Sequence, residues 1–353
     1  MRDYRLTACA AILMLGGLFA DAIAQNPLDD VAKRLNPADF KEWRLPAEPP
    51  HPADNKPNAA RVELGKMLFF DPRLSRGGNT SCATCHNPTL GWSDGRGTGI
   101  GFEGKTLDRA SPSVINAAFN AVQMWDGRKK DLEDQAMGPM EAGAEMNTDI
   151  DQFFKWIKSN RGYQEAFAKA YPGEAPGPDA LRKAIASYER TIISRTSPFD
   201  RWLEGDKQAM TTQQLRGLVI FTDKNKGNCA VCHAPPNFTD HGFHNLGLAS
   251  FGKPNPDLGR YAHKPVANMR GAFKTPQLRD IERSAPYFHD GSAKTLMDVV
   301  EHYNRGGDVR TNLSVSMKQL NLSQSDKEDL VAFMKALSSP PIMVTLPLLP
   351  QDE

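Results

Sequence analysis

The stretch Cys82-Ala83-Thr84-Cys85-His86 returns, in the same pattern, as Cys229-Ala230-Val231-Cys232-His233. C-x-x-C-H is the attachment motif of c-type haem. Two thiols at this spacing can both reach the vinyl groups of one porphyrin, and the adjacent histidine then gives the iron a nitrogen ligand. We therefore expect two covalent haem c groups, with iron ligands from His86 and His233.

Paired cysteines have two other common uses, which remain open at this point. They bind structural zinc, and they perform thioredoxin-like redox chemistry, although the βαβ pattern that accompanies the latter is not evident here. The fifth cysteine, Cys9, lies in a segment that we expect to be removed.

Composition narrows the class of partner. The 353 residues suffice for two modest domains. Lys and Arg number 43 and Asp and Glu number 42, so no overall field attracts nucleic acid or anionic lipid, and we expect neither as a partner. The 28 glycines and 26 prolines indicate that much of the chain is loop.

The N-terminus is typical of a secretory signal. Arg2 and Arg5 precede a mostly apolar run over residues 6–19, and Ala22-Ile23-Ala24 has the form of a cleavage site. We expect a signal peptide at residues 1–24 and export to the periplasm. An uncleaved membrane anchor is the alternative, but the apolar run is short for a span.

The mature chain divides into two halves. An apolar segment and a polar loop precede each motif, at residues 64–71 and 215–223, and this weak repeat predicts two related haem domains. Residues 180–193 have a helical period after a Gly- and Pro-rich break at 172–178. We place the boundary after that helix, giving domains at 25–197 and 198–353.

The fold class expected is mainly α: two cytochrome c-like domains with long loops and few short strands. Near the C-terminus, Ser325 and Glu328 fit a capping box before a helix. The apolar stripe of that helix consists of Leu330, Phe333, Met334 and Leu337.

A second helix is expected at residues 295–305, where Thr295 and Asp298 fit a cap. Tyr303 falls on its apolar face with Leu296, Val299 and Val300, whereas His302 points about 100° away. We therefore expect Tyr303 to face the interior and His302 not to. A core tyrosine bonded to a carbonyl is the alternative. Other candidates to ligate an iron are Met269, Met297 and Met317.

Several further stretches resemble the bacterial di-haem cytochrome c peroxidase and MauG family. Together with both haem motifs, they cover nearly all of the mature chain: residues 65–72 (GKMLFFDP), 125–128 (WDGR), 273–276 (FKTP) and 285–291 (APYFHDG).

This resemblance implies roles for individual residues. The first haem would react with peroxide, the second would hold the electron reserve, and Trp125 would carry electrons between them. Gln135, Pro139 and Glu145 match the distal pocket, with Glu145 as the general base. The plain alternatives are core packing for Trp125 and a solvated surface position for Glu145.

Two departures place the chain in the MauG-like or MbnH-like branch. Phe102 stands where peroxidases that need reductive activation have an iron-capping histidine, so the first iron is expected to be open. Tyr303 matches the position of the second haem's methionine ligand. A phenolate favours the higher charge on iron.

Two other positions limit the resemblance. Gly227 stands where MauG has a surface tryptophan that serves its protein substrate. The resemblance also implies a calcium ion, whose carbonyl ligands are matched by Ser284 and Pro286, but Ala110 replaces the asparagine ligand of the family.

Three functions follow. The leading hypothesis is a periplasmic di-haem peroxidase that reduces hydrogen peroxide and, MauG-like, stores oxidising equivalents on two haems to oxidise a residue of a partner protein. The second is a cytochrome c peroxidase that takes electrons from a small cytochrome c. The third is a non-catalytic di-haem electron carrier.

Overall fold

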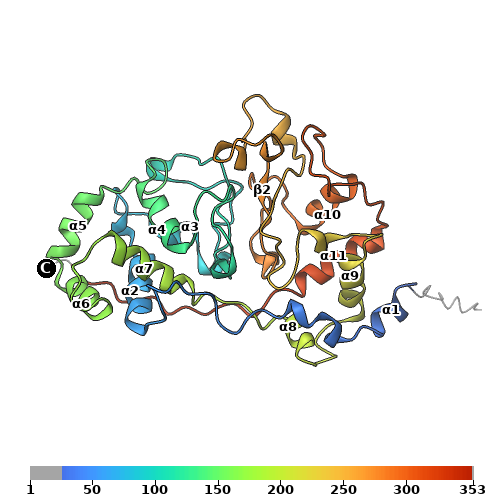
Figure 1. The fold of residues 1–353 in the computed structure, drawn as a ribbon, viewed down its shortest axis with the longest axis horizontal. Coiled ribbons are helices and arrows are strands. Elements are labelled where there is room, and N and C mark those ends of the chain that lie inside the picture. Colours follow the sequence, from blue (N-terminus) through green and yellow to red (C-terminus); the bar gives the residue numbers. More distant parts are fainter. Residues whose placement is uncertain (1–25, 352–353) are drawn as a thin grey trace, which may run out of the picture.

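The computed structural model describes residues 26–351, which form two helical lobes beside each other (Figure 1). The expected signal peptide therefore lies outside the described residues. The α-helices are α1 (Asp29–Lys33), α2 (Ala59–Phe70), α3 (Cys82–Cys85), α4 (Leu132–Glu141), α5 (Ile150–Ser159), α6 (Arg161–Ala170), α7 (Pro178–Glu189), α8 (Pro198–Leu203), α9 (Thr212–Thr222), α10 (Leu296–Arg305) and α11 (Gln324–Lys335).

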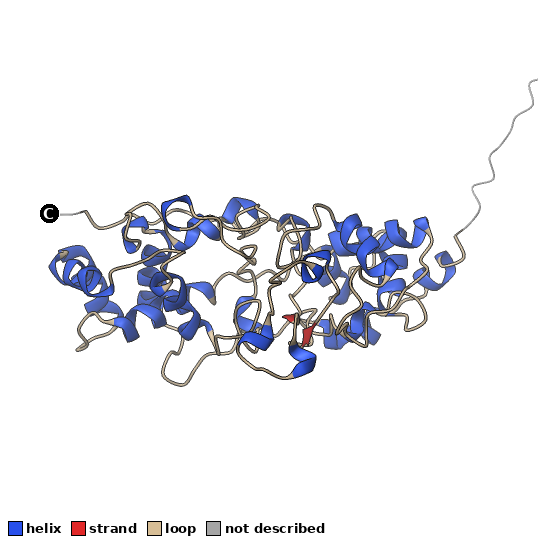
Figure 2. Cartoon of the chain, turned by 90° about the horizontal axis from the view of Figure 1, so that it is seen from above, coloured by secondary structure: helices blue, strands red, loops and turns tan. Residues whose placement is uncertain are grey.

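The remaining regular structure is short. Two-residue strands β1 (Phe243–His244) and β2 (Phe273–Lys274) pair antiparallel, with Phe243 opposite Lys274. The 3-10 segments include η1 (Pro37–Trp43), η4 (Phe102–Gly104), η6 (Cys229–Val231) and η10 (Ile281–Arg283). Long loops connect these elements, as the Gly and Pro content predicts (Figure 2). No helix within residues 26–351 is both long and apolar enough to cross a membrane.

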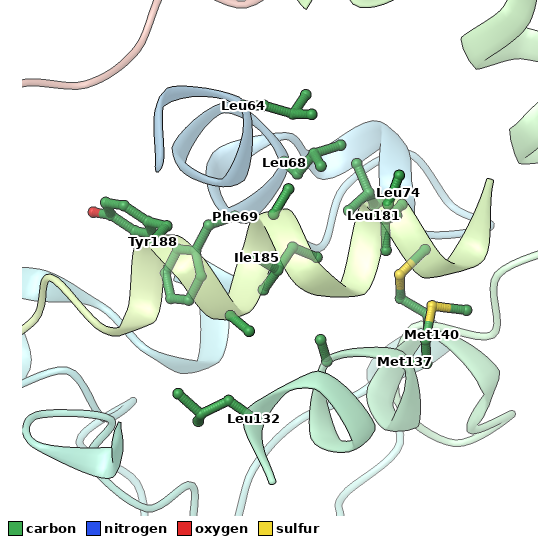
Figure 3. Packing of buried hydrophobic residues seen from close by; sticks show 14 of the residues in the cluster. Leu64, Leu68, Phe69, Leu74, Leu132, Met137, Met140, Leu181, Ile185 and Tyr188 are labelled. Carbon is green, nitrogen blue, oxygen red and sulfur yellow. The ribbon is translucent and has the colours of Figure 1, made fainter. Parts of the chain in front are cut away.

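The first lobe is built around α7, which lies between α2 and α4 (Figure 3). Gly65 of α2 makes this packing close, since a Cβ there would lie 1.9 Å from the carbonyl oxygen of Ala184 on α7. The gap is filled by a core that includes Leu64, Leu68, Phe69, Leu132, Met140, Leu181 and Ile185.

The second lobe repeats this arrangement with α9 and α11. Gly217 of α9 would place a Cβ 2.0 Å from the carbonyl oxygen of Asp329 on α11. Around the crossing, Phe199, Phe221, Phe238 and Phe333 pack edge to face. Each apolar segment before a motif is therefore a helix with a glycine at its crossing point.

The N-terminal segment packs on the second lobe, and the C-terminal tail packs on the first. Trp43 precedes the first motif but packs in the second core, against Phe199, Phe221 and Phe238. The tail after α11 runs back along the first lobe, as the lower edge of Figure 1 shows. There Ile342 and Val344 pack on the first core.

Three local expectations needed correction or adjustment. The cap of α11 is Ser323 with Asp326, two residues before the expected Ser325 and Glu328. Both pairs fit the same pattern, and only the chain's path selects one. The helix after residue 178 ends at Glu189 rather than at residue 193. Arg190 and Thr191 form a turn, and Asn116 then hydrogen-bonds the backbone N–H and carbonyl of Ser194, which therefore do not pair within a helix.

The third correction concerns α10. Its cap at Thr295 and Asp298 is as expected. His302, expected on the outer side, is instead buried, and its Nε2 lies 2.9 Å from the carbonyl oxygen of Leu246. The loop through Leu246 therefore packs against α10 at His302, which is why this side chain is buried.

Candidate functional site: a cavity shared by both motifs

One cavity of about 1010 Å³ is lined by residues of both C-x-x-C-H motifs. Cys82 begins the short helix α3, which Ser81 and Thr84 cap, and Cys229 begins η6. All four motif sulfurs are free of disulfides. Residues from both lobes complete the lining, so tertiary folding brings the two motifs to one enclosed space.

The sulfur environment favours an uncharged form. Burial raises the pKa of Cys85 to about 11 and that of Cys229 to about 12, and it raises the pKa of Cys82 further still. A zinc site would need thiolates, whereas a thioether carries no charge. Within residues 26–351, the one cluster spaced to hold a metal joins Cys232 to Asp240 and His244, without the other cysteine of its motif.

Each motif histidine has its Nδ1 atom facing a backbone carbonyl oxygen. The Nδ1 of His86 lies 3.4 Å from the carbonyl oxygen of Trp92, and the Nδ1 of His233 lies 3.0 Å from that of Phe238. Burial lowers the pKa of both rings, which keeps them neutral. A neutral imidazole whose Nδ1–H is taken by a carbonyl has Nε2 free for a metal, so both residues fit a haem iron.

Tyr303 lines the same cavity from α10. Burial, and then the neighbouring sulfurs of Cys232 and Cys229, raise the pKa of its phenol. No hydrogen bond reaches its hydroxyl from any residue that the structure describes, unlike a core tyrosine bonded to a carbonyl. Of the three alternative methionines, Met317 lines the cavity and is buried, whereas Met269 and Met297 lie elsewhere.

The expected distal residues meet on the first-lobe side of the cavity. Gln135 and Pro139 lie one turn apart on α4, and Glu145 follows in the turn after that helix. Burial raises the pKa of Glu145, and Arg128 lowers it by less. The glutamate is therefore a partly buried cavity residue rather than a solvated surface one.

Trp125 also lines the cavity, and its orientation is fixed. Its Nε1–H donates to the carbonyl oxygen of Ala110 at 2.9 Å, and its ring contacts His289 edge to face. The backbone of Trp125 accepts a hydrogen bond from Lys274 of β2, so the tryptophan joins the two lobes. His289 in turn stacks on Phe273 with ring centroids 3.5 Å apart.

The loop that contains Phe102 is closed onto the distal turn. Phe102 N donates to the carbonyl oxygen of Ala144 at 3.0 Å, and a Cβ at Gly101 would lie 1.9 Å from that oxygen. Gly101 lines the cavity, but the Phe102 ring is not part of the lining and lies under Lys105 instead.

The structure also describes the position of the MauG surface tryptophan and the positions of the family's calcium site. A Cβ at Gly227 would lie 2.6 Å from the carbonyl oxygen of Ile220, so the backbone leaves no room for a tryptophan there. Ser284 and Pro286 line the cavity, and the oxygen of Ala110 is already bonded to Trp125.

Sequence reasoning missed one cavity residue of note, Glu189. It lies one helical turn after Ile185, whose apolar face on α7 was recognised, and this register is the signal that could have found it. The carboxyl lines the cavity although it belongs to the buried face of its helix.

Comparison with known proteins identifies the family. A family model described as di-haem cytochrome c peroxidase matches residues 59–208. The methylamine utilization protein MauG of Methylorubrum extorquens is 42% identical over 346 residues, which cover 96% of each chain. The chain belongs to the di-haem cytochrome c peroxidase and MauG family.

Two further members of this group are similar over most of the chain. The cytochrome c551 peroxidase of Pseudomonas aeruginosa is 36% identical over 349 residues, covering 96% of this chain and 95% of that protein. The crystal structure of a MauG-like protein associated with microbial copper homeostasis matches with a TM-score of 0.78 and 28% identity, covering 84% of this chain and 95% of that one.

The family fixes the general chemistry. The chain is a haem-dependent peroxidase-type oxidoreductase with two haem groups, and its mainly α-helical fold is confirmed. The disulfide-free motif cysteines, the lowered pKa of both motif histidines and the shared cavity all fit two such groups.

Proposed function

We propose that the chain is a periplasmic, MauG-like enzyme that reduces hydrogen peroxide and oxidises a residue of a partner protein. Covalent attachment would use Cys82 and Cys85 for the first haem and Cys229 and Cys232 for the second. The observation that carries the proposal is the Tyr303 hydroxyl, which faces the second site without a hydrogen bond.

The haems would supply the redox chemistry, accepting two oxidising equivalents from peroxide. His86 would ligate the first iron, and His233 and Tyr303 the second. A phenolate oxygen stabilises a more positive iron than a thioether does, so this site suits the storage of an oxidising equivalent. Export through the signal at residues 1–24 belongs to the same proposal.

Glu145 would move the proton. It would take a proton from the near oxygen of hydrogen peroxide and return it to the leaving oxygen. Gln135 and Pro139 shape the same side of the cavity. The loop that contains Gly101 is packed against the turn of Glu145. This packing favours a first haem that reacts with peroxide without prior reduction.

Trp125 would conduct electrons between the two haem sites. Its fixed indole N–H and its contacts with elements of both lobes support this role. The backbone around Gly227 leaves no room for an aromatic side chain. The partner protein would therefore dock at another part of the surface.

Ligation of the second iron tests the proposal. The native ferric protein should lack the near-infrared band of methionine ligation, and Tyr303→Met should create it. This variant should keep peroxide binding at the first haem and lose partner oxidation. A methionine band in the native protein, lost in Met317→Leu, would contradict the proposal.

That contrary result would favour the second candidate, a cytochrome c peroxidase with a small cytochrome c as donor. The buried, cavity-lining Met317 is the observation that keeps it open. Rapid peroxide turnover with reduced cytochrome c would support it.

A non-catalytic carrier would not need Glu145 in the cavity. A calcium ion near Ser284 and Pro286 remains a minor proposal.

A further inference from the structure

A buried carboxyl group of the first lobe takes no part in the chemistry proposed above. Glu189 ends α7 and is 3% exposed. Its Oε2 is buried without a hydrogen-bond partner, and no ion pair reaches the side chain from the described part of the chain. Buried polar atoms are nearly always paired, so this carboxyl requires an explanation.

The carboxyl belongs to the first haem's side of the cavity. Glu189 lines it together with Ile185, one turn earlier on α7, which Figure 3 shows between α2 and α4. Glu189 also raises the pKa of Cys82 through its charge, so the two side chains are close. Glu189 therefore faces the haem that Cys82 would hold, and the inference rests on that proposed attachment.

The surrounding charges do not neutralise Glu189. Arg190 is its immediate neighbour, but both terminal nitrogens of Arg190 bond Glu133 of α4, at 2.7 and 2.9 Å. Glu133 adds negative charge, and on α2 the nearest acid is the exposed Glu63. The sulfur of Cys82 would be an uncharged thioether. Burial raises the pKa of Glu189 to about 8, and Arg190 only partly opposes this.

We propose that Glu189 is the redox-linked proton site of the first haem. Its carboxylate binds one proton from solvent when that iron gains one electron, going from Fe(III) to Fe(II), and releases it when the electron leaves. The physical reason is charge: the more positive iron stabilises the carboxylate across a low-dielectric cavity, and the reduced iron does so less. An electrode with small-molecule mediators supplies the electron in the test below.

A potentiometric titration of the loaded protein between about pH 6 and 10 tests this proposal. The reduced state holds the extra proton, so the midpoint potential of the first haem should fall as pH rises. The limiting slope is one proton per electron, about 59 mV per tenfold change in proton concentration. Glu189→Gln is neutral at every pH, so its potential should stay near the low-pH value of the wild type.

The matched control is Glu141→Gln, which removes an exposed carboxylate from the same lobe. It should keep the wild-type slope. An unchanged slope in Glu189→Gln would overturn the proposal and assign the proton to another group, with Glu145→Gln as the next variant to titrate.

A measurement on the wild type covers the case in which Glu189→Gln fails to fold. Infrared difference spectra should gain a protonated-carboxyl band on reduction of the first haem, and this band should shift in D₂O. Its absence overturns the proposal. A pyridine haemochrome count of two covalent haems keeps this result separate from the proposed function, which fails if the first haem is not attached.

Discussion

At the scale of single residues, Glu145 and Glu189 show how one cavity can hold two different carboxyl groups. Glu189 is buried and Glu145 is partly buried, and burial raises the pKa of both. Glu145 lies in a turn beside α4 and has Arg128 near it, whereas Glu189 ends a helix and its neighbouring arginine is already paired. The first is therefore suited to moving a proton during turnover, and the second to holding one.

The variant Glu145→Gln removes the carboxylate that we propose as the base and keeps the shape of the side chain. The rate of peroxide consumption by the ferric first haem should fall about 10²–10⁴-fold, the usual share of general acid–base catalysis. A base acts when deprotonated, so the wild-type rate should rise with pH through the raised pKa of Glu145, and the variant should lose this rise. Stopped-flow spectra across pH would show it, and an equal rate in both proteins would place the base elsewhere.

At the scale of elements, glycines mark where two segments of backbone touch. Gly65 and Gly217 allow α2 to cross α7 and α9 to cross α11. Gly101 does the same for two loops, because its contact with Ala144 brings the loop after the first motif against the turn of Glu145. The position of this loop is therefore coupled to the position of the turn that contains Glu145.

Changing Gly101 to alanine should displace Glu145, because the added Cβ would overlap a backbone oxygen that cannot rotate away. We expect a loss of peroxide reactivity approaching that of Glu145→Gln. The double variant should then lose no more than Glu145→Gln alone, since neighbours that act through one group are not additive.

The control for this prediction is Gly97→Ala in the same loop, where the nearest atom to the new Cβ is 3.9 Å away. Its rate should match the wild type. Fully additive losses in the Gly101 and Glu145 double variant would show that Gly101 acts on some other part of the site.

At the scale of the whole molecule, the N-terminal segment packs on the second lobe and the C-terminal tail packs on the first, and this links the two lobes. The tail alternates in burial, with Ile342 and Val344 against the first core and Met343 almost fully exposed. Near its end, Asn160 Nδ2 donates to the carbonyl oxygen of Gln351 at 2.9 Å. The segment that follows α11 of the second lobe thus stabilises the first.

Replacing Ile342 and Val344 together by serine should destabilise the first lobe by about 2–4 kcal/mol, since each side chain buries part of its apolar area. Thermal unfolding followed by each haem's absorption would locate the change. The control Met343→Ser alters an exposed side chain and should unfold like the wild type. Equal unfolding temperatures of the wild type and both variants would mean that the tail does not stabilise the first lobe.

The sequence alone determined what depends on short separations along the chain. The haem motifs, the Thr295 cap and the apolar face of α10 involve residues within about two helical turns, so their spacing carries the information. Even at this range the predicted cap of α11 was wrong, because Ser325 and Glu328 fit the capping pattern as well as Ser323 and Asp326 do.

Only the tertiary structure decided what depends on segments far apart. The burial of His302 needs the loop through Leu246, and the backbone of Ser194, beyond the end of α7, pairs with Asn116. Glu189 lines the shared cavity without a counter-ion because α4 supplies Glu133 to Arg190. Burial and charge at these positions come from long-range packing, which no local pattern specifies.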